Sequence, residues 1–275
     1  MRILFIGDIV GRPGRDLIKH GLAALIDHHH VDFVIANGEN AAAGFGITRE
    51  IGEQLFDFGI DVLTSGNHIW DKREALDYIG IEPRLLRPAN YPAVAPGNGR
   101  YLARSRTDIS VGVVNVMGRV FMLNIDDPFA VVLREIEGLK AHTRIVFVDF
   151  HAEATSEKLA MGWYLDGKVT AVVGTHTHVQ TADERILPKG TAYLTDVGMT
   201  GPHDSIIGVE IGPALGRFLS ALPQKFETAT ANPRLNAVIV EADERTGRAE
   251  DIERLSYSLD ELIDLANEGS VRSAV

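Results

Sequence analysis

The sequence predicts an α/β protein in which a mixed sheet, or two packed sheets, is flanked by helices. Short apolar runs alternate with segments of helical periodicity along most of the 275-residue chain, as in strands joined by helices. Toward the C-terminus this alternation gives way to consecutive strand-like segments, which indicates antiparallel strands. With 45% hydrophobic residues the chain can bury a sizeable core, and we expect residues 1–275 to form a single domain.

The N-terminal part starts as strand, turn and helix. Ile3–Ile6 is an apolar run of strand length, and the turn at 11–14 separates it from a segment with an apolar helical face. Phe33–Ala36 and Val62–Thr64 are similar short runs. We expect each of these runs to be a buried strand.

Capping signals predict two helices in the next part of the chain. Thr48 is suited to cap a helix that extends to Phe58, where Gly59 stops it. Asp71, followed three residues later by Glu74, has the spacing of a capping box for the next helix.

The middle of the chain contains an irregular segment followed by further alternation. Residues 84–100 are rich in proline and glycine, so we expect them to wrap the surface or rim a site rather than link two domains. Asp127 and Pro128 are suited to the start of a helix, as cap and first-turn residue. The other elements expected here are strands at Val111–Val116, Ile145–Phe150 and Ala171–Val173 and a helix at Ser156–Trp163.

The C-terminal part has a different pattern. After an expected strand at Thr191–Thr195, the segments Lys225–Thr230 and Leu235–Glu241 are both strand-like, and we expect them to pair at a sheet edge. The remaining expected elements are a turn at Asp243–Gly247, a strand at Ile252–Tyr257 and a helix at Ser258–Asn267.

Composition argues against several classes of function. The formal net charge of −11 disfavours broad electrostatic binding to nucleic acid or to anionic membranes. The absence of cysteine excludes disulfides, thiolate zinc sites and iron–sulfur clusters. The first apolar stretch is too short for a signal peptide, and no later run has the length of a membrane span, so we expect a cytoplasmic protein.

Residues that can bind a metal ion follow five of the apolar runs. His176 and His178 are the most informative pair, because residues i and i+2 of extended backbone point the same way and can converge on one ion. In an α/β sheet the carboxyl ends of strands form the edge where ligands bind, so distant residues can meet there. The candidate ligands are Asp8, Glu39, Asn40, Asn67, His151, His176 and His178. Seven donors exceed the needs of one four-coordinate site, which favours two metal ions.

Each candidate taken alone has a simpler structural interpretation. His151 could be a hydrogen-bonded structural histidine, Asn67 could cap a turn, and Asp8 could cap the helix that follows it. Their recurrence at the ends of several runs favours a metal centre over independent structural roles. Arg12 and Arg119 could contact a substrate phosphate, but surface pairing explains them equally well, and we leave them out of the candidate site.

These motifs and their order resemble the calcineurin-like metallophosphoesterase superfamily. The resemblance rests on Gly7-Asp8, Asn37-Gly38-Glu39-Asn40, Gly66-Asn67-His68, His151 and Gly174-Thr175-His176-Thr177-His178. Residues 2–8, 87–90, 149–158 and 191–202 look more closely like the YmdB-type bacterial phosphodiesterases. The resemblance implies a four-layer α/β/β/α sandwich of two mixed sheets with outer helices, a dinuclear site at the strand ends, and a homo-oligomer.

The resemblance also implies how the ligands divide between the two ions. Asp8, Glu39, Asn40 and His178 would hold one ion, while Glu39, Asn67, His151 and His176 would hold the other, so that Glu39 bridges them. This chain departs from the usual Asp-x-His motif of the superfamily, because Asp8-Ile9-Val10 lacks the second ligand and Glu39 stands where a bridging aspartate is usual. We expect Asn40 to supply the missing donor.

Such a centre predicts hydrolysis of phosphodiesters. Two cations about 3.5–4 Å apart can bind phosphate oxygens and lower the pKa of a bridging water, and His68 is suited to protonate the leaving alkoxide as general acid. Oxygen and imidazole donors suit iron, manganese or zinc better than magnesium, and we expect iron or manganese. The expected substrate is a small phosphodiester, with 2′,3′-cyclic nucleotides suggested by the resemblance. A phosphomonoesterase, or a metal-containing regulatory protein that binds a nucleotide without turnover, is the alternative.

Overall fold

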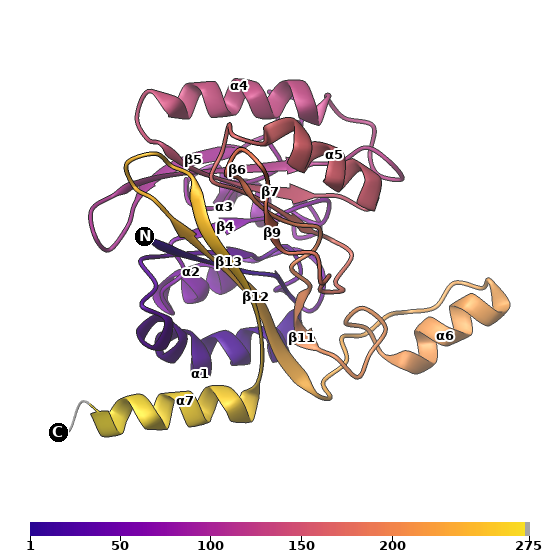
Figure 1. Cartoon of the computed structure of the whole chain (residues 1–275). Helices are drawn as coiled ribbons and strands as arrows, with labels where there is room; N and C mark the ends of the chain where they lie inside the picture. Colours follow the sequence, from indigo (N-terminus) through magenta and orange to yellow (C-terminus); the bar gives the residue numbers. More distant parts are fainter. Residues whose placement is uncertain (273–275) are drawn as a thin grey trace.

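The computed structural model describes residues 1–272 and consists of two packed β-sheets with helices outside them (Figure 1). The strands are β1 (Arg2–Ile6), β2 (Asp8–Ile9), β3 (Phe33–Asn37), β4 (Val62–Thr64), β5 (Arg100–Arg104), β6 (Ser110–Met117), β7 (Ile145–His151), β8 (Ala171–Thr175), β9 (Arg185–Ile186), β10 (Ala192–Leu194), β11 (Met199–Pro202), β12 (Pro233–Ala242) and β13 (Ala249–Ser258). The helices are α1 (Gly11–His29), α2 (Arg49–Asp57), α3 (Ala75–Ile79), α4 (Pro128–Lys140), α5 (Thr155–Leu165), α6 (Ile211–Ser220) and α7 (Leu259–Arg272).

Both sheets are mixed. The seven-stranded sheet has the order β2-β11-β12-β1-β3-β4, with β13 paired to β12, and the six-stranded sheet has the order β5-β6-β7-β8-β10-β9. In the first sheet β1 is parallel to β3 and antiparallel to β12, and in the second β6 is parallel to β7 and antiparallel to β5.

Three buried clusters correspond to the spaces between four layers. Between the sheets, Phe5 of β1 stacks on Phe147 of β7 with ring centroids 5.4 Å apart. A second cluster joins the outer face of the first sheet to α1, α2 and α7, and a third joins the outer face of the second sheet to α4 and α5. The predicted four-layer α/β/β/α sandwich of two mixed sheets is therefore confirmed, while the extent of the single domain stays a prediction.

Several local predictions are confirmed. The Thr48 hydroxyl accepts a hydrogen bond from Ile51 N at 3.2 Å and caps α2, and Asp127 caps α4 by accepting from Phe129 N at 3.0 Å. Residues 84–99 form no helix or extended strand but wrap around β6, where the Asn90 side chain binds both backbone groups of Met117.

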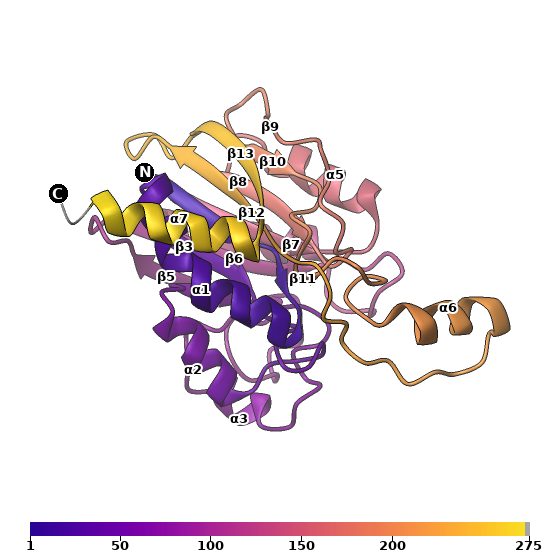
Figure 2. The same cartoon turned by 90° about the horizontal axis from the view of Figure 1, so that it is seen from below.

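Other predictions were wrong. Lys225–Thr230 is not a strand. It lies in a mostly exposed arm formed by residues 203–232, between β11 and β12, and within the segment only Thr228 makes a bridge, to Val209. Leu235–Glu241 lies inside the sheet as part of β12, between β1 and β13, instead of at an edge. The helix α6 was not expected, since glycine and proline interrupt its sequence; it extends away from the body in both views (Figures 1 and 2).

The predicted capping box of α3 was also wrong. The helix begins at Ala75, and Glu74 makes no side-chain cap. The Asp71 carboxylate instead accepts from the His68 imidazole. In the described part of the chain, residues 1–272, no helix is both long enough and apolar enough to cross a membrane.

Candidate metal centre

The strand ends of both sheets deliver the candidate ligands to one place. In the first sheet Asp8 follows β1, Glu39 and Asn40 follow β3, and Asn67 follows β4. In the second sheet His151 is the last residue of β7, and His176 and His178 follow β8. Because β1, β3, β7 and β8 run with their carboxyl ends toward the same edge, the two sets face each other across the sandwich.

Glu39, His151 and His176 form the centre of the cluster. One potential ligand atom from each lies within 4.8 Å of the others. Glu39 Oε1 is 3.1 Å from His151 Nε2, and Asn67 Oδ1 is 3.0 Å from the same nitrogen. The His151 and His176 rings meet edge to face at 4.6 Å, and His176 also contacts Glu153, whose Oε2 is 3.1 Å from Nε2.

Asp8 connects the second group of candidates to this cluster. Its Oδ2 accepts from the backbone N–H of His176 at 3.2 Å, and its Oδ1 lies 4.0 Å from His178 Nε2. Asn40 donates from its side-chain amide to the Gly44 carbonyl at 3.0 Å, which leaves its buried Oδ1 free to act as a ligand.

Electrostatics favour an ionised Glu39. Burial by itself raises the pKa of this carboxyl group, but the charge and hydrogen bond of His151, together with His68, outweigh it and lower the pKa to about 2. For His151 the burial effect has the opposite sign and lowers the pKa. The charges of Glu39 and Asp8 outweigh this effect, so that the pKa of His151 is raised overall. These two buried groups therefore stabilise each other's charged forms in the absence of a cation.

Burial is the main cause of the pKa shifts of two other candidate ligands, His176 and Asp8. Burial, followed by the neighbouring His151, lowers the pKa of His176 to about 3, so its imidazole is neutral at pH 7 despite the contact with Glu153. Burial also raises the pKa of Asp8 to about 6, an effect that His178 opposes. A bound cation would favour the ionised carboxylate and use the neutral imidazole as a ligand.

Unpaired oxygen atoms provide the test of whether these residues suit a metal ion. Within residues 1–272, Asp8 Oδ1 and Asn40 Oδ1 are buried and have no hydrogen-bond donor, and the buried Glu39 Oε1 has the contact with His151 Nε2 at 3.1 Å. Buried oxygens without a partner cost free energy, and a cation would satisfy them. Gly66 contributes the space, because a Cβ atom there would lie 2.1 Å from His151 Nε2 and 2.4 Å from Glu39 Oε2. The residues fit a metal centre on both grounds.

Residues behind the ligands were not identified from the sequence. The Nδ1 atom of His151 is held by the Thr175 hydroxyl at 2.9 Å, and that hydroxyl donates to Asp149 at 2.8 Å. His178 Nδ1 is held by the carbonyl of Ile207 at 2.8 Å. In both histidines Nε2 is left to face the carboxylates, which is the usual arrangement behind metal-binding imidazoles. Thr175 adjoins a predicted ligand in the sequence and Asp149 lies two residues from one, but only the fold shows this contact.

His68 lies at the rim of the cluster. Its backbone N–H donates to Glu39 Oε2 at 3.2 Å, and its side chain is 29% exposed. The imidazole Nδ1 is 2.8 Å from Asp71 Oδ2, and the ring packs edge to face against Phe45. Asp71 thus fixes the orientation of the ring and leaves Nε2 available to a substrate.

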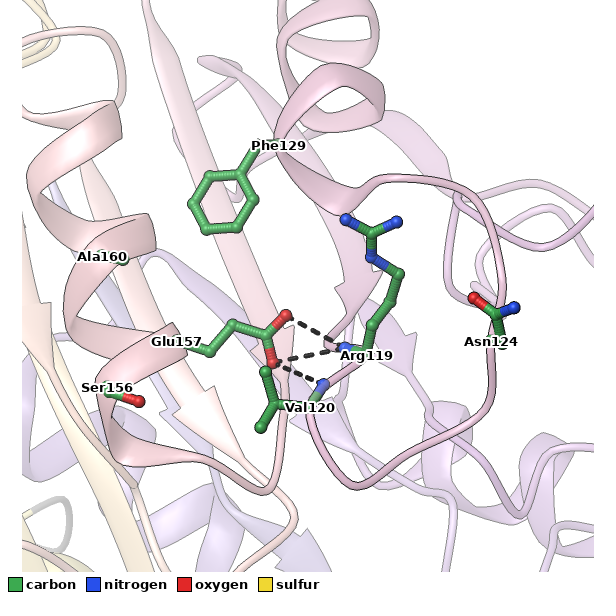
Figure 3. Close-up of a pocket in the computed structure, with 7 residues that line it drawn as sticks. All are labelled: Arg119, Val120, Asn124, Phe129, Ser156, Glu157 and Ala160. Atoms are coloured by element: carbon green, nitrogen blue, oxygen red, sulfur yellow. Dashed lines mark hydrogen bonds between the residues drawn. The ribbon is translucent and has the colours of Figure 1, made fainter.

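A cavity of about 550 Å³ lies outside the ligand cluster, between α5 and the segment that leads from β6 into α4 (Figure 3). The Glu157 carboxylate is held by the backbone N–H groups of Arg119 and Val120, and the Arg119 guanidinium lies 3.5 Å from Asp127. Arg119 therefore forms a surface ion pair, which was the alternative to a contact with a substrate phosphate.

A family model described as YmdB-like protein matches residues 4–255 of this chain. The chain belongs to the YmdB-like family. A 2′,3′-cyclic-nucleotide 2′-phosphodiesterase of Bacillus subtilis is 49% identical over 263 residues, which cover 95% of this chain and 99% of that protein. The resemblance inferred from the motifs is thereby confirmed.

Two solved structures of similar proteins share the fold of this chain. A hypothetical protein from Thermus thermophilus is 43% identical with a TM-score of 0.87, and the match covers 94% of this chain and 99% of that one. A novel phosphatase from Mycoplasma pneumoniae is 35% identical with a TM-score of 0.88 and coverage of 94% and 93%.

Proposed function

We propose that this protein is a dinuclear metal-dependent phosphodiesterase that hydrolyses 2′,3′-cyclic nucleotides. The observation that carries the proposal is a set of buried oxygens at one edge of the sandwich: Asp8 Oδ1 and Asn40 Oδ1 have no hydrogen-bond partner, and Glu39 Oε1 lies against the His151 imidazole of the opposite sheet. The substrate class is supported by the name of the Bacillus subtilis relative, which covers nearly the whole chain.

The ligands would divide as the family resemblance implies. Asp8, Glu39, Asn40 and His178 would hold one ion, and Glu39, Asn67, His151 and His176 the other. The chemistry that two bound metal ions supply is neutralisation of phosphate charge and activation of water. The donor set of carboxylate, amide and imidazole supports iron or manganese, with zinc also suitable. Elemental analysis of the purified protein tests this assignment.

His68 would protonate the leaving alkoxide. Its Nδ1–H donates to Asp71, so a protonated ring carries its second proton on Nε2, the nitrogen that Asp71 does not use. The hydrogen bond from the His68 backbone to Glu39 keeps this ring beside the metal ligands. A positioned acid typically contributes about 10²- to 10⁴-fold in rate.

Leaving-group dependence tests this role. The His68→Ala variant should retain its metal and lose about 10²- to 10⁴-fold in turnover of 2′,3′-cyclic AMP, whose leaving alkoxide needs a proton. With bis(p-nitrophenyl) phosphate, whose leaving group is stable as an anion, the loss should be much smaller. Equal losses on both substrates would remove His68 as general acid.

Phosphomonoester hydrolysis is the second candidate, because the similar Mycoplasma pneumoniae structure carries the name phosphatase. The ratio of turnover on bis(p-nitrophenyl) phosphate to turnover on p-nitrophenyl phosphate separates the two activities. A ratio well above one supports the diesterase. Tight binding of 2′,3′-cyclic AMP without turnover of any ester would favour a regulatory protein instead.

The homo-oligomer is also a proposal, supported by the arm that contains α6. Phe218 and Leu219 are 79% and 80% exposed, and Ile211 and Leu222 are also exposed. Exposed apolar clusters of this kind often mark protein interfaces. If copies of the chain associate through the arm, Phe218→Asp should reduce the mass measured by light scattering. The cytoplasmic location and the absence of nucleic-acid and membrane binding stay predictions.

A further inference from the structure

Lys158 is a buried lysine that the proposed chemistry does not use. Its side chain, on α5, is 1% exposed, and lysine is almost never buried so completely unless it is paired. The partner is Asp196, also fully buried, whose Oδ2 lies 2.6 Å from Nζ. This ion pair joins α5 to the segment that follows β10.

Asp196 connects this ion pair to the segment that carries two candidate ligands. Its Oδ2 accepts from both the hydroxyl of Thr177, at 2.6 Å, and the backbone N–H of Thr177, at 3.2 Å. Its Oδ1 accepts from Gly198 N at 2.7 Å. Thr177 is the residue between His176 and His178, so one buried carboxylate holds the link between the two imidazoles.

The backbone of this segment needs such support. His176 and His178 have φ angles of 95° and 64°, in the left-handed region that non-glycine residues rarely adopt. Conformations of this kind persist only where the surrounding structure determines them. Asp196 provides the hydrogen bonds that do so, and Lys158 provides the charge that allows a carboxylate to be buried there.

We propose that Lys158 is a positioning residue of the metal centre. Its ammonium group neutralises Asp196, and Asp196 holds Thr177 so that His176 points to Glu39 and His151 while His178 points to Asp8. The inference rests on the proposed metal centre, and it assigns a role to a lysine that touches no ligand atom in the described cluster. A purely structural ion pair would stabilise the fold without affecting metal affinity.

Metal binding by the full-length, metal-free protein tests the proposal. Dissociation constants for Mn²⁺ can be measured from the paramagnetic resonance signal of free Mn²⁺, and the unfolding temperature of the same metal-free samples reports structural damage. Lys158→Met removes the charge at similar length, and Thr177→Val removes the hydroxyl at similar shape. We expect each to raise the Kd by about 10- to 100-fold, as for other groups that orient ligands.

Two controls separate positioning from stability. Thr177→Ser keeps the hydroxyl and should restore nearly the wild-type Kd. Tyr193→Phe removes a buried hydroxyl whose partner is the hydroxyl of Thr195, 3.0 Å away, and should lower the unfolding temperature without raising the Kd. A Lys158→Met protein that unfolds at lower temperature but binds Mn²⁺ like the wild type would overturn the proposal.

The double variant tests whether Lys158 acts through Thr177. If both belong to one chain of contacts, adding Lys158→Met to Thr177→Val should raise the Kd little further, whereas a full multiplicative effect would contradict this path. If Lys158→Met does not fold, the same two measurements are made on Lys158→Gln, and a folded Lys158→Gln protein with the wild-type Kd for Mn²⁺ would overturn the proposal. A wild-type protein that binds no Mn²⁺ would overturn the metal centre itself, which is distinguishable from failure of the positioning role alone.

Discussion

The Gly66→Ala variant should lose metal binding, because the added methyl group would occupy the space between His151 and Glu39. The added Cβ would lie 2.1 Å from His151 Nε2 and 2.4 Å from Glu39 Oε2, whereas non-bonded heavy atoms pack at about 3.5–4.0 Å. The His151 ring would therefore have to move by more than about 1 Å. Metal sites hold their ligand distances to within about 0.2 Å, so this displacement is several times what a bound ion tolerates.

The expected losses follow from that displacement. A shift of about 1 Å in a catalytic group can cost about 10²-fold in rate, so turnover of bis(p-nitrophenyl) phosphate should fall at least by that factor. The Kd for Mn²⁺ should rise by at least about tenfold. Overpacking a buried site typically lowers the free energy of unfolding by about 1–3 kcal/mol, which leaves the protein folded at 25 °C.

A second glycine supplies the matched control. At Gly212, in α6, an added Cβ meets nothing within 4 Å, so Gly212→Ala introduces the same methyl group without a contact. That variant should keep wild-type turnover and metal affinity. Wild-type Mn²⁺ affinity and turnover in Gly66→Ala would refute the reasoning, because the methyl group occupies the space in which the ligands converge.

Three further outcomes are expected. Thr48→Ala should lower the free energy of unfolding by about 0.5–2 kcal/mol through loss of the α2 cap, while Thr48→Ser should not; chemical denaturation measures both. Burial lowers the pKa of His29 in the folded protein, so the unfolded state takes up a proton on His29 first and the free energy of unfolding decreases as the pH falls below about 6.5. In His29→Gln this pH dependence should be shallower, as measured by thermal unfolding from pH 8 to pH 5. Asp71→Asn should slow turnover of 2′,3′-cyclic AMP less than His68→Ala does, because it removes the group that orients the proposed general acid, His68, and retains the imidazole itself; equal effects in steady-state kinetics would contradict this.

The strands and their polar ends could be predicted because the signals are local. An apolar run such as Ile145–Phe150 needs no knowledge of the rest of the chain to be assigned as a buried strand, and the cap at Thr48 depends on a residue three positions away. The same locality misled the prediction at Lys225–Thr230. Its composition suits a strand, but no neighbouring strand is in place to pair with it.

Contacts between residues far apart in the sequence could not be predicted. Asp149 binds Thr64 from the other sheet at 2.5 Å, and Lys158 binds Asp196 across 38 positions of sequence. The capping box at Asp71 failed for a local reason, because the carboxylate accepts a hydrogen bond from the imidazole of His68, three residues earlier, and the helix begins at Ala75.

By itself, the sequence determined the chemical nature of the centre: which oxygen and nitrogen donors are present, that no thiolate takes part, and that the donors follow short apolar strands. Only the tertiary structure decided which donors face one another, which oxygens remain unpaired, and that Gly66 leaves the space between them. The physical reason is that a side chain's chemistry is local, whereas the unpaired oxygens and the space between the ligands arise only when strands from two sheets meet at one edge.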